Sequence, residues 1–126
     1  MEVLSYLYGR IGNRKNKLGK DGFKKALDYK FNEMKIKTPG HWDNKWRVVI
    51  FDISEDKRKL RDRLRSKLKE MGFISLNESV LIYPYLCQDE VEFVKEVFSV
   101  EREVTYLTME RFEGDDYYYD RFFSED

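Results

Sequence analysis

The chain has little that would hold it together covalently or anchor it in a membrane. Its 126 residues include one cysteine and two prolines, and the single thiol, Cys87, has no partner for an intramolecular disulfide. No apolar run approaches the roughly 18 residues that cross a bilayer, and no charged-then-apolar export signal opens the sequence. These absences predict a cytoplasmic protein without a membrane partner, held together by a core drawn from its 41% hydrophobic residues.

A net charge is missing too, because 24 basic residues balance 24 acidic ones. The balance hides an uneven distribution: residues 1–40 carry ten Lys/Arg against four Asp/Glu, residues 41–100 eleven of each, and residues 101–126 three against nine. A basic first segment can bind phosphate groups that an acidic last segment repels. The alternative is that the two ends neutralise each other, within one chain or across a dimer.

Residues 46–51, WRVVIF, predict a strand at the centre of a sheet, because they are almost continuously apolar and β-branched. Ser54 is placed to cap a following helix. From residue 57 to 71 apolar side chains recur at helical spacing, namely Leu60, Leu64, Leu68 and Met71. Gly72 is expected to end this helix, since glycine readily adopts the left-handed backbone that closes one.

Two short strands, a helix and a last strand are predicted to follow. Residues 73–76 and 79–83 form the strands, reversing at Asn77-Glu78, residues 88–98 form the helix, and residues 103–109 form the last strand. The order βαββαβ predicts an α+β, ferredoxin-like fold with an antiparallel sheet and both helices on one face. The other face needs cover, so we expect a homodimer with the last strand at its contact.

Two further segments flank this unit, and they divide the chain into residues 1–40, 41–112 and 113–126. The first is basic, with a helix predicted over 21–34 and a Thr-Pro-Gly linker at 38–40. The last is acidic and tyrosine-rich, and its aromatic side chains favour docking on the body over disorder.

Residues 40–112 resemble the CRISPR-associated Cas-two family. The resemblance lies in the apolar strand that runs into FDISED, the basic helix that ends in KEMGF, and the strand that begins ESVLI. The flanking WDNKW and the pair Pro84-Tyr85 are closest to the Cas-two-like domain of phenylacetate (PaaX-type) repressors. Asn77 and Leu81 depart from the family pattern, which often has glutamine and an aromatic residue there.

Residues 1–40 are similar to the trailing half of the winged helix that precedes this domain in those repressors, with LGKDG at 18–22 where the wing meets its last helix. The leading expectation from the resemblance is a dimeric bridge that positions duplex DNA for the Cas-one integrase during CRISPR spacer acquisition. The alternatives are a Mg²⁺-dependent endonuclease, acting on RNA or DNA, and a PaaX-type transcriptional regulator.

By this resemblance Asp52 is the candidate catalytic and metal-binding residue. It follows the first strand, where the family pairs it with its two-fold mate, and two carboxylates brought together repel unless a Mg²⁺ ion lies between them. The ion would polarise a phosphate or activate water. The alternative is that Asp52 caps the following turn through backbone amides.

The helix over 57–71 is rich in basic residues, which fall on both sides of its leucine stripe. Arg58, Arg61, Arg65 and Lys69 follow one flank, and Lys59, Arg63 and Lys67 follow the other. Guanidinium groups one turn apart suit successive phosphates of a duplex backbone, with no base being read. Four residues of the first segment form a second candidate patch for nucleic acid: Arg10, Arg14, Lys15 and Lys17. The alternative is an ordinary solvated helix face.

Overall fold

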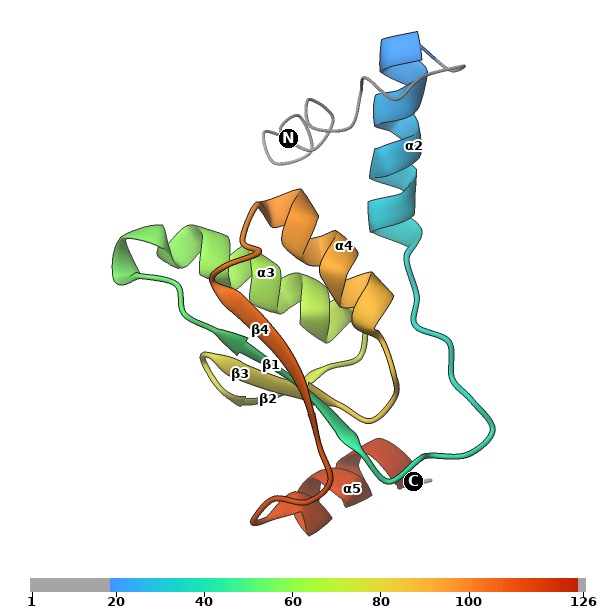
Figure 1. The fold of residues 1–126 in the computed structure, drawn as a ribbon, viewed down its shortest axis with the longest axis vertical. Helices are drawn as coiled ribbons and strands as arrows, with labels where there is room; N and C mark the ends of the chain where they lie inside the picture. The colour runs from blue at the N-terminus through green and yellow to red at the C-terminus, as the bar shows by residue number, and fades with distance from the viewer. Residues whose placement is uncertain (1–18, 125–126) are drawn as a thin grey trace.

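The computed structural model describes residues 19–124, shown in Figure 1. The predicted basic patch of Arg10, Arg14, Lys15 and Lys17 lies outside the described residues, as does the first part of the winged-helix-like segment. The elements in chain order are α2 (Gly19–Glu33), β1 (Trp46–Phe51), the 3-10 turn η2 (Glu55–Lys57), α3 (Arg58–Glu70), β2 (Ile74–Asn77), β3 (Val80–Tyr83), α4 (Gln88–Phe98), β4 (Val104–Met109) and α5 (Asp115–Phe123).

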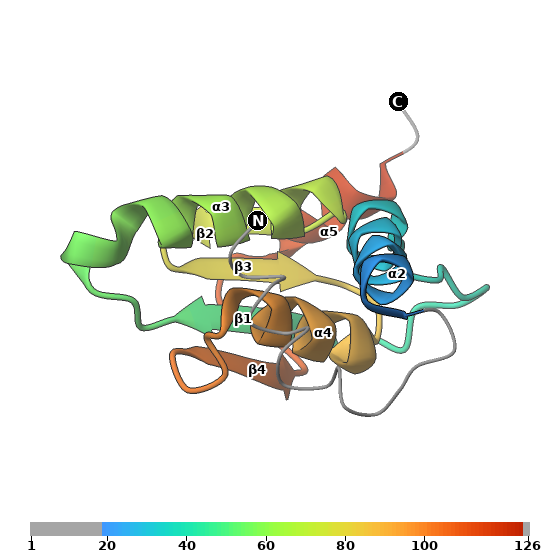
Figure 2. The same cartoon turned by 90° about the horizontal axis from the view of Figure 1, so that it is seen from above.

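The four strands form one antiparallel sheet in the order β2-β3-β1-β4. Strand β1 is central, as its apolar sequence predicts, and pairs Val49 with Leu81 on one side and with Tyr106 on the other. Helices α3 and α4 both lie on one face of the sheet, as the views from the front and from above show (Figures 1 and 2). The predicted α+β, ferredoxin-like fold is therefore confirmed.

Most element bounds lie within a residue of their predicted places, and two local differences have a clear cause. The β2–β3 reversal falls at residues 78–79, because the side-chain carbonyl of Asn77 accepts a hydrogen bond from the Ser79 amide at 2.8 Å. Ser54 precedes a 3-10 turn rather than α3 itself, and its hydroxyl donates to the carboxylate of Asp56. Ser54 is thus the N-cap residue of this 3-10 turn, but its side chain makes no capping hydrogen bond.

The end of α3 is fixed by Gly72, as predicted. Its φ of 115° is left-handed, its amide donates to the Lys69 carbonyl at 3.0 Å, and the Phe73 amide donates to the Leu68 carbonyl at 3.0 Å. This pair of bonds satisfies carbonyls that the helix end would otherwise leave open. A Cβ at position 72 would also lie 2.8 Å from Cε1 of Tyr83, so only glycine fits.

The main core lies between the sheet and its helices. Leu64 and Leu68 of the α3 stripe and the valines of α4 are almost fully buried there, as their spacing predicts, while Leu60 is half-buried. Helix α2 joins the same core through Leu27 and Phe31, and the ring of Phe31 meets that of Phe98 with centroids 5.8 Å apart. The segment before the ferredoxin-like unit therefore shares a core with it.

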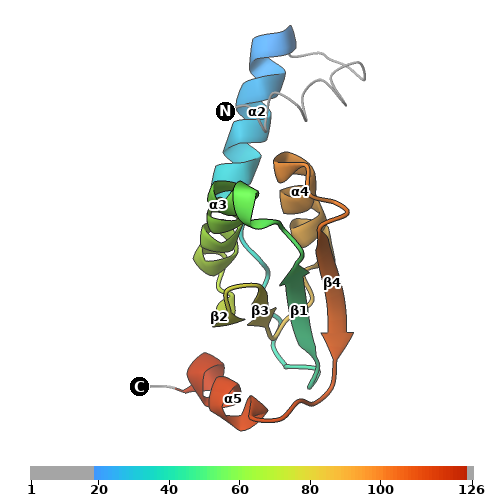
Figure 3. The same ribbon diagram turned by 90° about the vertical axis from the view of Figure 1, so that its left-hand side faces the viewer.

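The opposite face of the sheet is covered in part by α5. This helix lies across the end of the sheet where β1 begins and β4 ends (Figure 3), and Phe122 packs on Trp46 with ring centroids 5.8 Å apart. The tail thus docks on the body, as its aromatic content predicts. Further along the same face, four apolar side chains remain half-buried: Ile50, Leu76, Val80 and Leu107.

Helices α2 and α5 lie at opposite ends of the domain (Figures 1 and 3). Lys24, Lys25 and Lys30 of α2 are therefore not neutralised by the acidic side chains of α5 in the same chain. No helix among residues 19–124 is both long enough and apolar enough to cross a membrane.

Candidate nucleic-acid interface

The basic residues of η2 and α3 comprise an exposed set, a buried set and the half-buried Arg65. Five are exposed to solvent, namely Lys57, Arg58, Lys59, Arg63 and Lys69. The acids of the same stretch do not balance them, because residues 55–70 hold eight Lys/Arg and four Asp/Glu. This surface therefore carries a positive field that favours an anionic partner.

In the first predicted flank of α3, from Arg58 to Lys69, the residues at the two ends are accessible to a ligand. The side chain of Arg58 is 65% exposed and only loosely paired, with 3.4 Å between its guanidinium and the Glu55 carboxylate, while Lys69 is exposed. Arg65 is half-buried and lies beside the β2–β3 turn, donating to the Glu78 carbonyl at 3.4 Å. An exposed pair at this distance contributes little stability, so a phosphate can replace the carboxylate at small cost.

In the middle of the same flank, Arg61 is buried and therefore not directly accessible to a phosphate. Its guanidinium lies 3.5 Å from the Glu55 carboxylate and 4.0 Å from that of Glu78, and its Nε has no hydrogen-bond partner among the described residues. Arg61 is thus held beneath two exposed acids. A phosphate would have to displace them to reach it.

The second flank serves the fold at one position. Lys67 is buried, and its ammonium donates to the Phe31 carbonyl at 2.6 Å and to the Glu70 carboxylate at 2.9 Å. It also lies 4.4 Å from the centroid of the Phe31 ring, a cation–π contact. Lys67 therefore caps the end of α2, whereas Lys59 and Arg63 on the same flank are exposed.

Asp52 is exposed at the end of β1, beside the last strand. Its backbone amide donates to the Glu103 carbonyl at 2.6 Å, and both residues line a hollow of about 240 Å³ with Ser54 and Lys57. Among the described residues no hydrogen bond reaches the Asp52 carboxylate, so it does not cap the following turn. Within residues 19–124, no group of three or more His, Cys, Asp or Glu side chains is placed to hold a metal ion.

The comparisons with known proteins place this architecture in a family. Residues 39–118 match the PaaX protein central Cas2-like domain, and this range holds the whole sheet, α3, α4 and the first turn of α5. The chain belongs to this family. No curated protein and no solved structure matches it at a significant level.

Within the Cas2-like domain, sequence reasoning missed an ion pair between buried Arg47 and half-exposed Asp43, at the start of β1. Arg47 is 4% exposed on β1, and its guanidinium contacts the Asp43 carboxylate at 2.7 and 2.8 Å and the Pro84 carbonyl at 3.0 Å. The hydrogen bonds from Arg47 lower the pKa of Asp43 to about 2. The sequence feature that could have indicated this ion pair is an arginine inside an apolar strand, four residues after an aspartate.

The linker and the thiol of the Cas2-like domain are structural. Trp42 donates from its indole nitrogen to the Lys45 carbonyl at 2.9 Å and packs edge-on against Trp46, so the two tryptophans hold the linker on the domain. Cys87 is 1% exposed, and burial raises the pKa of its thiol to about 12. A buried thiol with a raised pKa is a poor nucleophile.

Proposed function

We propose that this protein is a dimeric duplex-DNA-binding regulator of the PaaX type, with α3 as its phosphate-contacting helix. The observation that carries the proposal is the match to the PaaX central domain over a fold whose α3 exposes four basic residues, Arg58, Lys59, Arg63 and Lys69. The same match leaves the bridging role beside a Cas-one integrase as the competing proposal.

The exposed residues of α3 suit a duplex backbone. Arg58 and Lys69 are eleven residues apart, which corresponds to about 16 Å along the helix and about five base pairs of duplex. Arg65 and Arg61 lie between them, so four cations follow one line once Glu55 and Glu78 yield to phosphate. Contacts of this kind position DNA and carry no sequence information. Base recognition would then belong to the winged-helix-like segment at residues 1–40.

A second copy of the chain is the proposed cover for the open part of the sheet. Ile50, Leu76, Val80 and Leu107 are only half-buried on that face, and β4 is an edge strand. Exposed sheet edges and apolar faces favour pairing with another chain. Sedimentation should give a dimer at tens of micromolar, and a stable monomer there would contradict this part of the proposal.

The regulator and the integrase bridge are separated by one pair of experiments on the intact protein. A regulator should crosslink to a small number of chromosomal sites and should not retain a Cas-one integrase in a pull-down. A bridge should give the reverse pattern. Retention of the integrase without discrete chromosomal sites would overturn the regulator.

A Mg²⁺-dependent endonuclease centred on Asp52 is a second candidate, favoured by the exposed carboxylate that caps nothing. Mg²⁺ binds through one or two carboxylates and keeps several waters, so Asp52 from each of two copies would suffice to hold it. The ion would polarise a phosphate. Nuclease activity on RNA or DNA should vanish with chelator and with Asp52→Asn. Cleavage that persists in Asp52→Asn at the wild-type rate removes Asp52 from the mechanism.

A further inference from the structure

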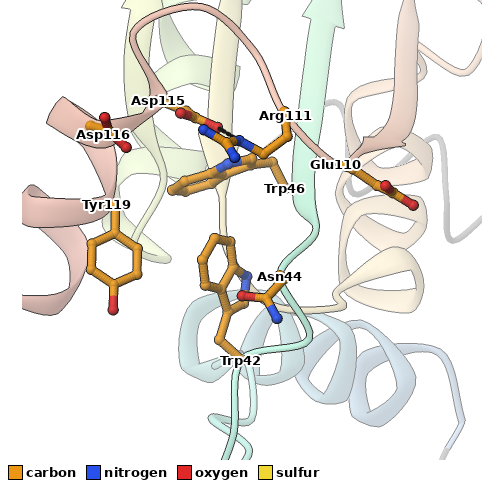
Figure 4. A pocket seen from close by; sticks show the side chains of 8 residues that line it. All are labelled: Trp42, Asn44, Trp46, Glu110, Arg111, Asp115, Asp116 and Tyr119. Atoms are coloured by element: carbon orange, nitrogen blue, oxygen red, sulfur yellow. Dashed lines mark hydrogen bonds and ion pairs between the residues drawn. The ribbon is translucent and has the colours of Figure 1, made fainter.

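A small hollow lies where the linker, the end of β4 and α5 meet, on the far side of the domain from α2 (Figure 4). Its volume is about 170 Å³. The lining has two parts, an aromatic floor of Trp42, Trp46 and Tyr119 and a polar rim of Asn44, Glu110, Arg111, Asp115 and Asp116. Neither part belongs to the α3 surface proposed for DNA.

The aromatic floor is held in place by its own packing. The rings of Trp42 and Trp46 meet edge-on with centroids 4.9 Å apart, and Tyr119 lies 5.6 Å from Trp42. Trp46 is 1% exposed and supports the floor from below, whereas Tyr119 is 46% exposed and Trp42 is half-buried. Trp42 and Tyr119 are therefore the rings that a ligand would touch.

The rim is acidic, and only one of its acids is neutralised. Asp115 is buried and accepts a hydrogen bond from the Arg111 guanidinium at 3.1 Å. Glu110 and Asp116 are exposed, and neither forms a salt bridge within residues 19–124. Figure 4 shows Asp116 and Tyr119 on one side of the two indoles and Glu110 on the other. The two free carboxylates thus flank an aromatic surface.

The linker side of the hollow is rigid before any ligand arrives. Asn44 has a left-handed φ of 65°, a conformation that asparagine tolerates better than most residues, and the neighbouring Asp43 is clamped by Arg47. The indole nitrogen of Trp42 is fixed to the Lys45 carbonyl at 2.9 Å. A site whose walls are already ordered loses less entropy on binding.

We propose that this hollow binds an organic cation, an alkylammonium or guanidinium group. Aromatic faces attract weakly hydrated cations, and carboxylates at the rim add long-range attraction without chelating geometry. An anion would be repelled by the unpaired acids, and a small metal ion gains nothing from indole rings. The site and its ligand are independent of the proposed DNA-binding function.

The test uses the intact protein and matched pairs of probes. Titration of ¹⁵N-labelled protein with methylguanidinium or tetramethylammonium should shift the indole signal of Trp42 to saturation, with a dissociation constant on the order of millimolar. Methylurea and tert-butanol, the neutral isosteres, should leave it in place. The double variant Glu110→Gln with Asp116→Asn should weaken cation binding by about fivefold or more, because both carboxylates are removed.

The control is Glu113→Gln with Asp120→Asn, which removes the same charge from exposed positions of the same segment that do not line the hollow. It should leave cation affinity within about twofold of wild type. Equal losses in the two double variants, equal shifts with the neutral isosteres, or shifts that never saturate would each overturn the proposal.

A third set of titrations tests whether the cation is a protein side chain or a free small molecule. The peptide acetyl-Gly-Arg-Gly-amide is compared with methylguanidinium, with the citrulline peptide as its neutral control. Tighter binding of the arginine peptide identifies a protein side chain as the ligand. Tighter binding of the free cation identifies a small molecule, and both results support the site.

Discussion

The ammonium of Lys67 lies 2.6 Å from the carbonyl oxygen of Phe31, which is 36 residues earlier in the chain. The carbonyl belongs to the last turn of α2, where helices leave such groups without an intrahelical donor. One buried cation on α3 therefore fixes the end of the helix that precedes the Cas2-like domain. This bond adds to the apolar contacts of Leu27 and Phe31 that hold α2 on the domain.

Lys67→Met should lower the free energy of unfolding by about 1–3 kcal/mol, since it leaves a buried carbonyl without its donor. Hydrogen exchange should show the loss first in the last turn of α2. Lys69→Met is the control, because Lys69 is exposed on the same helix and its change should stay within about 0.5 kcal/mol. Equal effects in urea unfolding would contradict the capping role.

Glu78→Gln should strengthen duplex binding about threefold at low salt. The Glu78 carboxylate lies 4.0 Å from the guanidinium of Arg61, so its removal frees that group and reduces repulsion of phosphate. Fluorescence anisotropy measures the change, which should fade as salt rises. Glu92→Gln offers a matched control, because Glu92 is an exposed acid that pairs with buried Lys95 on α4. If both variants bind alike, Glu78 does not shield a phosphate site.

Gly72→Ala should lower the free energy of unfolding by about 2 kcal/mol or more. A side chain at φ 115° is strained, and its Cβ would lie 2.8 Å from the Tyr83 ring. Gly40→Ala should be nearly neutral, because a Cβ there meets nothing within 4 Å and the backbone is not left-handed. Thermal unfolding of the two variants tests this, and equal unfolding midpoints for Gly72→Ala and Gly40→Ala would refute the steric argument.

The Asp43–Arg47 pair should make stability fall in acid. The pKa of Asp43 is about 2 in the folded chain against an ordinary value of 3.8, so its contribution is present above about pH 4 and is lost as the pH falls towards 2. The size is about 1 kcal/mol, because the Asp43 side chain is 50% exposed and solvent screens the pair. Urea unfolding should show wild type and Asp43→Asn converging in this window. A constant difference between pH 5 and pH 2 would count against the pair.

Sequence periodicity predicts the sheet and its two covering helices well. The apolar stripes of α3 and α4 and the continuous apolar run of β1 have one compatible arrangement, and Gly72 marks a helix end by backbone preference alone. The tail was expected to dock, but its folding into α5 depends on the surface that Trp46 and Ile82 present, which exists only in the folded sheet.

The sequence alone could not show which basic residues of α3 are exposed and which are buried. A run of Lys and Arg on an amphipathic helix is normally solvated, and helical spacing places Arg61 and Lys67 with their neighbours on the flanks. Their burial follows from distant partners: Glu78 in the β2–β3 turn closes over Arg61, and α2 packs on Lys67. The same holds for the cation-binding hollow, whose walls come from three separate segments.

The central claim is that exposed basic residues of α3 contact duplex phosphates, and the salt dependence of binding tests it most directly. Each lost phosphate contact should reduce the slope of log affinity against log salt by about 0.9. Arg58→Ala with Lys69→Ala should therefore lower the slope by about 1.8, equally on two unrelated duplex sequences. Lys45→Ala with Arg102→Ala, the same charge loss at exposed positions outside α3, should leave the slope unchanged. Identical slopes for wild type and the α3 double variant would contradict the account.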